Sequence, residues 1–166
     1  MRPHAGPNPA TEPPAPEPPT TEQPAPERPD FRAALARGPE AAVEAAWQLK
    51  MLNWGERHRE RGGDPASPLA GLLRLLRAAH AEPRLRRLMP GTSHFSLWFS
   101  LSTTYPSVAA GPTITEPLRG GGYLVRFRTD EDPVAAATAE EAVALIVASL
   151  PADLGEVFNH PVEQGR

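Results

Sequence analysis

The sequence predicts one α+β domain: N-terminal helices, followed by a three-stranded antiparallel sheet with a C-terminal helix packed on it. Apolar residues recur every three or four positions between residues 40 and 81, a spacing typical of helices. Residues 92–102 and 123–128 instead alternate between apolar and polar side chains, as half-buried strands do. Short turns join the strand-like segments, which favours an antiparallel meander over parallel crossovers.

The first 30 residues differ in composition from the rest of the chain. They contain eleven of the 22 prolines, five acidic residues and no aromatic residue. Such a segment buries too little apolar surface to offset the entropy that is lost on ordering. We therefore expect residues 1–30 to be a disordered tail rich in proline and glutamate, and residues 31–166 to form one domain. The tail contains P-x-x-P spacings that suit aromatic grooves, but its composition is more typical of a solvated spacer.

Three helices are expected before the sheet. A short helix at residues 31–37 stops at Gly38, and Pro39 suits the first turn of the next helix. That second helix is expected to reach residue 61. Its apolar stripe comprises Val43, Trp47, Met51 and Trp54. Ser67 followed by Pro68 is an N-cap signal for a third helix, which carries leucines on one face.

Residues 92–102 form the segment around which the sheet is expected to be organised. One face would carry Phe95, Leu97, Phe99 and Leu101, and the other would carry His94, Ser96, Trp98, Ser100 and Ser102. Pro90 and Gly91 are expected to break the chain just before this strand. A weaker strand is expected within residues 108–115, and another at residues 123–128 after a glycine-rich turn.

The last helix is predicted from a capping box. Thr138 and Glu141 have the spacing of this motif, and Pro151 would end the helix. The segment between them is apolar around most of its circumference, which is typical of a helix that lies across a sheet. A short edge strand is also expected near residues 156–158.

Composition and charge exclude several classes of protein. The chain contains no cysteine, which excludes disulfides, thiolate metal ligands and a cysteine nucleophile. Its formal net charge of −3 argues against general nucleic-acid binding. No apolar run approaches the roughly 20 residues that a membrane span needs, and the N-terminus lacks the apolar region of a signal peptide. We therefore expect a cytoplasmic protein that binds neither nucleic acid nor membrane.

No catalytic or metal-binding motif is recognisable. The five histidines are scattered without metal-binding spacing, so we expect no metal and no other cofactor. Asp130, Glu131 and Asp132 are more typical of a solvated turn than of a calcium loop. His94, at the start of the organising strand, is a candidate general base. A hydrogen bond from its ring to the backbone is the simpler interpretation, because no nucleophile accompanies it.

Several short motifs in the second half of the chain match a known family in the same order. They are TSHFSLWFSLSTTYP, GP, GGGYLVRF and ATAEEAVALIVASLPADLG. Over residues 40–160 the sequence resembles the DUF6193 natural product biosynthesis family, an actinobacterial family of unknown function. The resemblance implies a small accessory protein associated with specialised-metabolite gene clusters, and it implies no mechanism or catalytic residue. The proline-rich N-terminus is an addition to the family pattern.

The combination of residues that best suits a binding surface is Trp98 with Arg126 and Arg128. If their strands are neighbours, these side chains share the polar face of the sheet, where an arginine can stack on the indole. Tryptophan and arginine are also enriched at binding hot spots. The alternative is that an N-terminal helix covers Trp98, so that helices cover both faces of the sheet.

A local excess of basic residues lies between residues 50 and 88 and ends with Arg84, Arg86 and Arg87. It can dock an acidic partner or a phosphate, or it can consist of solvated helix faces. We expect a non-catalytic accessory or binding module that presents the Trp98 face or this basic region to a protein or peptide partner. The alternative function is a small biosynthetic enzyme or cyclase with a pocket near His94.

Overall fold

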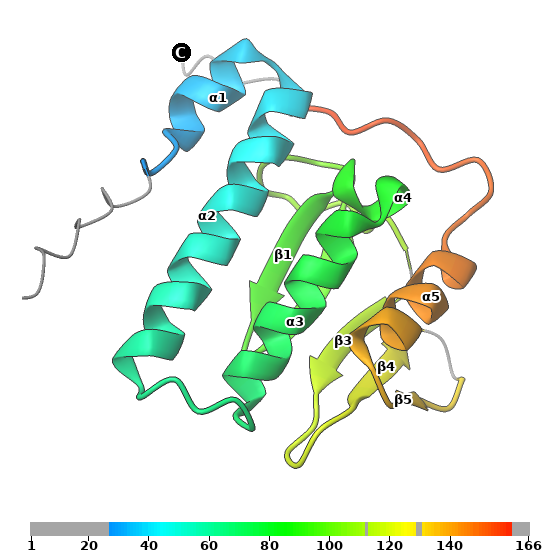
Figure 1. Cartoon of the computed structure of the whole chain (residues 1–166). Coiled ribbons are helices and arrows are strands. Elements are labelled where there is room, and N and C mark those ends of the chain that lie inside the picture. The colour runs from blue at the N-terminus through cyan, green and yellow to red at the C-terminus, as the bar shows by residue number, and fades with distance from the viewer. Residues whose placement is uncertain (1–26, 112, 129–130, 161–166) are drawn as a thin grey trace, which may run out of the picture.

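The computed structural model of the chain describes residues 27–111, 113–128 and 131–160. Within these residues four helices come first, then five strands and a last helix (Figure 1). The helices are α1 (Phe31–Arg37), α2 (Pro39–Glu60), α3 (Pro68–Ala81), α4 (Pro83–Arg86) and α5 (Ala139–Ser149). The strands are β1 (Met89–Ser93), β2 (Ser96–Ser100), β3 (Thr113–Pro117), β4 (Tyr123–Phe127) and β5 (Val134–Ala136). The α+β class is confirmed, and the expected tail lies outside the described residues except for residues 27–30.

The sheet has five antiparallel strands in the order β1-β2-β3-β4-β5, so the predicted number of three is wrong. The expected single strand over residues 92–102 is a hairpin, because His94 and Phe95 form a two-residue turn between β1 and β2. Their φ angles are +47° and +70°, as such turns require. Pro90 and Gly91 lie inside β1 rather than breaking the chain. The prediction misses β5 because three residues show too little alternation to indicate a strand.

Pro90 is tolerated in β1 because β1 is an edge strand. Residues that flank a two-residue turn exchange hydrogen bonds, and the bonded pairs alternate along the hairpin. Counting from the Ser93–Ser96 pair, Pro90 and Phe99 form a pair that is not hydrogen-bonded. A proline at this position lacks an N–H that would otherwise point away from β2. The free edge of β1 is therefore a poor template for another strand.

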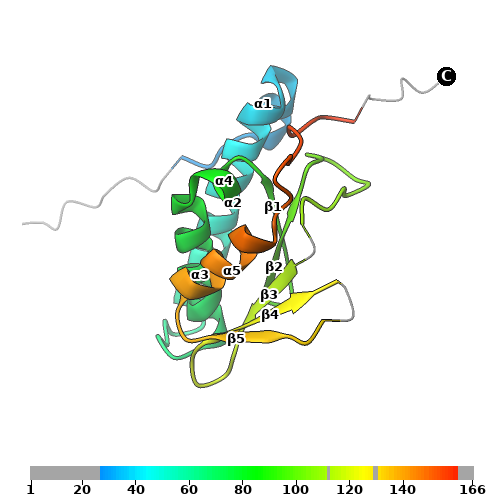
Figure 2. The ribbon, with the colours of Figure 1, turned by 90° about the vertical axis from the view of Figure 1, so that its right-hand side faces the viewer.

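The described helices cover one face of the sheet and leave the other face open (Figure 2). β1 lies against α2, β3 against α3, and β4 against α5. The core between the two layers includes Trp47, Leu72, Leu76, Leu97, Val125 and Ile146. Because Leu97 and Phe99 are buried beneath the helices, Trp98 between them points to the opposite side. The alternative in which helices cover both faces and bury Trp98 is therefore wrong.

The helix starts follow the predicted capping signals. The hydroxyl of Ser67 accepts a hydrogen bond from the backbone N–H of Ala70 at the start of α3. At the start of α5, the Thr138 hydroxyl accepts from the N–H of Glu141 at 3.1 Å. The Glu141 carboxylate in turn accepts from the N–H of Ala137 at 2.8 Å. These two reciprocal bonds form the predicted capping box.

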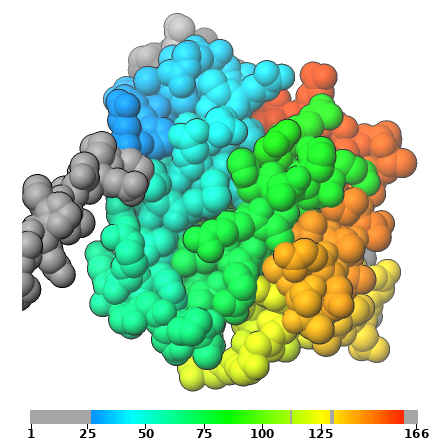
Figure 3. All heavy atoms as spheres, in the orientation of Figure 1, coloured from blue at the N-terminus to red at the C-terminus, as the bar shows by residue number. Residues whose placement is uncertain are grey.

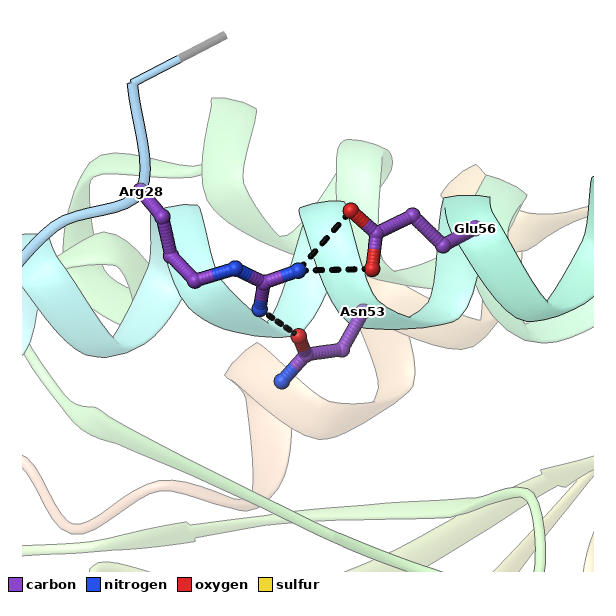
Figure 4. A network of polar contacts seen from close by, with 3 residues as sticks. All are labelled: Arg28, Asn53 and Glu56. Carbon is purple, nitrogen blue, oxygen red and sulfur yellow. Dashed lines mark hydrogen bonds and ion pairs between the residues drawn. The ribbon is translucent and has the colours of Figure 1, made fainter. Parts of the chain in front are cut away.

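An exposed ion pair holds the start of the domain against α2 (Figure 4). The Arg28 guanidinium donates to both carboxylate oxygens of Glu56, at 2.8 and 2.7 Å, and to the side-chain oxygen of Asn53. Exposed pairs of this kind contribute about 0–1 kcal/mol to stability. The contact joins the segment before α1 to the second half of α2.

After α5, a segment returns along the molecule to the end of β2. Phe158 forms a parallel bridge with Ser102, in which its N–H donates to Leu101 and its carbonyl accepts from Thr103. The Asn159 side chain donates to the carbonyl of Leu35 in α1 at 3.2 Å. Of the short strand expected near residues 156–158, pairing is seen at Phe158.

Candidate functional site

The open face of the sheet is the side that the described helices leave uncovered. The side chains at its centre, on β2, β3 and β4, are Ser96, Trp98, Ile114, Glu116, Leu124 and Arg126. Arg126 is exposed, whereas the others are half-buried. The register aligns Trp98, Ile114 and Arg126 in one row across β2, β3 and β4. An apolar centre with polar side chains around it is the usual arrangement at the core of a binding interface.

Trp98 is held against the sheet by its position over Gly91, its partner residue in β1. A Cβ atom added to Gly91 would overlap with the indole ring. Glycine at position 91 therefore makes room for the indole on the open face. The ring is supported by the backbone of β1 and stays partly accessible to solvent.

The expected stacking of an arginine on Trp98 is not found. β3 lies between β2 and β4, so the strands that carry Trp98 and Arg126 are not neighbours, and two strand spacings of about 4.8 Å separate them. Arg126 instead pairs with Glu116, with nitrogen–oxygen distances of 2.8 and 2.9 Å. Arg128 directly follows β4 and is exposed on the same side by alternation. Trp98 and the two arginines thus lie on the same face of the sheet, but neither arginine stacks on the indole.

A loop over residues 103–108 closes one end of the open face. Ser100 and Ser102, which were expected to face water, are buried beneath it. The Ser102 hydroxyl donates to the carbonyl of Pro106 at 2.8 Å and accepts from the N–H of Val108 at 3.1 Å. The Ser100 hydroxyl also accepts from the N–H of Val108, at 3.2 Å. These buried hydroxyl groups fix the backbone of the loop.

Tyr105 is the residue of this loop that the sequence interpretation missed. Its side chain is 92% exposed, and the loop lies on the side of the sheet away from the helices (Figure 2). A large aromatic side chain that contacts so little of its own chain, on a backbone fixed by Ser100 and Ser102, is typical of a binding residue. The signal in the sequence was a tyrosine directly before a proline in a segment without alternation.

His94 lies at the exposed tip of the β1–β2 hairpin. Its Nδ1 atom is 2.9 Å from the hydroxyl of Ser93, so its partner is a side chain and not the expected backbone group. In the described part of the chain, no carboxylate is hydrogen-bonded to its ring. Neither of the two hollows described below is lined by His94.

The basic region is divided among separate surfaces. Arg74 and Arg77 border a hollow of about 500 Å³ beside the start of α5, whereas Arg84, Arg86 and Arg87 line a groove beside α2. Lys50 is half-buried, and this burial lowers the pKa of its ammonium group. The predicted basic residues therefore do not form one continuous face.

No metal site is formed among the residues that the structure describes, because no three histidine or acidic side chains come together suitably. Asp130 lies outside those residues, so the predicted acidic turn is described only in part. Within the described ranges, no helix combines the length and the apolar character that crossing a bilayer requires.

A family model matches residues 41–161, which is most of the chain. The chain belongs to the DUF6193 family. This membership confirms the resemblance seen in the sequence, although the family is described only as one of unknown function. Comparisons of the DUF6193 protein with curated proteins and with solved structures found no match. The link to natural product biosynthesis is not part of the family description and stays a prediction.

Proposed function

We propose that the DUF6193 protein is a non-catalytic binding module that holds another protein against the open face of its sheet. The main evidence for this proposal is that two accessible aromatic side chains stand on backbone that is held in place. Trp98 rests on the backbone at Gly91, and Tyr105 stands on a loop that buried serines hold in place. The indole of Trp98 and the backbone that carries Tyr105 are already positioned, so less entropy is lost on binding and more of the contact energy contributes to affinity.

The charges around these aromatic residues also suit a protein partner. Among the polar side chains around the apolar centre, Arg126 and Glu116 form an ion pair with each other. Arg128 is exposed and forms no ion pair with the described residues. A carboxylate of the partner opposite Arg128 would complement this charge. The resemblance stated above suggests the class of partner, namely a protein of a natural product assembly.

Photo-crosslinking in lysate of the native host tests this function. The full chain carries a photoreactive phenylalanine analogue in place of Tyr105, and a control chain carries it in place of Arg59, an exposed residue of α2 away from the open face. We expect one dominant protein adduct at position 105, absent at position 59. A second substitution, Trp98→Ala, should remove that adduct while the melting temperature shows that the domain is folded.

Two results would contradict the proposal. One is the lack of any adduct at position 105 that is not also formed at position 59. The other is an adduct at position 105 that is formed equally well by the Trp98→Ala chain.

A further inference from the structure

A groove separate from the open face lies between the start of α2, the end of α4 and the segment after α5. Figure 3 shows these three parts of the chain close together at the upper right of the molecule. The groove has a volume of about 440 Å³, which is in the size range of small-ligand sites. Its apolar lining includes Val43, Leu88, Leu154 and Val157.

Charged side chains of both signs line this groove. Arg86 ends α4 and Arg87 follows it, Glu40 and Glu44 lie in the first turns of α2, and Glu156 lies in the segment after α5. Glu44 also accepts a hydrogen bond from the Gln48 side chain at 2.9 Å. In the described part of the chain, neither arginine forms an ion pair with any of these carboxylates. A ligand that has both a positive and a negative group can therefore pair with the carboxylates and with the arginines at the same time.

The third wall of the groove offers backbone groups. Arg84 fixes the start of this wall, since its guanidinium donates to the carbonyls of Val147 and Pro151 at 3.3 and 3.1 Å. Phe158 fixes the far end through its bridge to Ser102, which lies just after β2. Between these anchors, residues 155–157 make no backbone hydrogen bond to the described residues. An extended stretch with free N–H and C=O groups can pair with the backbone of a peptide.

We propose that this groove binds a short peptide with a free amino group and a free carboxylate. The peptide carboxylate pairs with Arg86 and Arg87, and its amino group pairs with the glutamates of α2 and with Glu156. The peptide backbone pairs with residues 155–157. This site does not depend on the function proposed for the open face, because none of these residues belongs to that face.

Trialanine is the probe that tests this site, because its charges lie only at its two ends and its side chains add none. The full chain is titrated with it while the backbone amide signals of Leu88 and residues 155–157 are followed by NMR. We expect saturable shifts of these signals. N-acetyl-trialanine and trialanine amide, which each lack one charge, should bind at least about tenfold more weakly, as expected for the loss of one charge-assisted contact.

Matched variants locate the site. Arg86→Gln combined with Arg87→Gln should weaken trialanine binding by at least about tenfold, whereas Arg59→Gln, an exposed arginine outside the groove, should leave it unchanged. Three results would overturn the proposal: no shift at millimolar trialanine, equal binding of the capped peptides, or equal binding of free alanine, which would make the groove an amino-acid site. The crosslink at position 105 is independent of all three.

Discussion

Thr115 offers the clearest test of how this sheet is stabilised. Its side chain is fully buried between its strand partners Leu97 and Val125, and its hydroxyl has no hydrogen-bond partner among the described residues. Burial of an unpaired hydroxyl lowers stability by about 1–3 kcal/mol. Valine has nearly the same shape, so Thr115→Val removes the hydroxyl without opening a cavity. We expect the free energy of unfolding to rise by about 1–2 kcal/mol, which corresponds to about 3–6 °C in melting temperature.

Urea denaturation with an unchanged m-value measures this effect, and Ser102→Ala provides the contrast. Ser102 is also buried, but its hydroxyl bonds to Pro106 and Val108. Its removal should therefore lower the free energy of unfolding, by about 1–3 kcal/mol. If Thr115→Val leaves stability unchanged or lowers it, the hydroxyl has a partner in solution and the reasoning is refuted.

Three further substitutions probe other features. Gly91→Ala should lower the free energy of unfolding by about 1–3 kcal/mol because the added methyl group displaces Trp98. In a double-mutant cycle, adding Trp98→Ala should recover part of this loss. Effects of the two substitutions that simply add would contradict the contact. His94→Asn should raise the free energy of unfolding by up to about 1 kcal/mol, because asparagine adopts a φ of +47° more readily. A decrease in this free energy would show that the hydrogen bond between His94 and Ser93 contributes more to stability than the relief of backbone strain. Because burial lowers the pKa of Lys50, the unfolded chain binds more protons between that lowered value and the ordinary one, and stability rises with pH across this window. Lys50→Met should raise the melting temperature at neutral pH and flatten this alkaline rise, and a rise of unchanged slope would exclude Lys50 as its cause.

The helices could be predicted from the sequence because their start signals are local. Ser67 and Thr138 each bond to an N–H three residues ahead, so the cap and its partner lie within one turn. The β1–β2 hairpin could not be predicted in the same way. Its turn consists of His94 and Phe95 rather than the usual glycine, and Phe95 packs on Trp54 at 5.8 Å between ring centres. That stabilising contact comes from a distant helix, and the local pattern does not show it.

The candidate site was predicted in part for the same reason. Alternation along β2 correctly places Trp98 and Leu97 on different faces of the sheet, because side-chain direction in a strand depends only on sequence position. The relation of Trp98 to Arg126 depends on whether another strand lies between theirs, and alternation contains no such information. The exposure of Tyr105 depends on hydrogen bonds that Ser100 and Ser102 make to the loop backbone, so the sequence pattern did not distinguish it.

The strands follow one another in the sheet as they do in the chain, and this affects the order of folding. Pairing of consecutive strands closes only short loops, which keeps the entropy of closure small. The contact between Asn159 and Leu35, by contrast, joins residues 124 positions apart. The segment that makes it forms one wall of the groove and pairs with Ser102, just before the Tyr105 loop. Because that segment leaves the ribosome after the residues that it contacts, synthesis completes the groove only after the helices and the sheet have emerged.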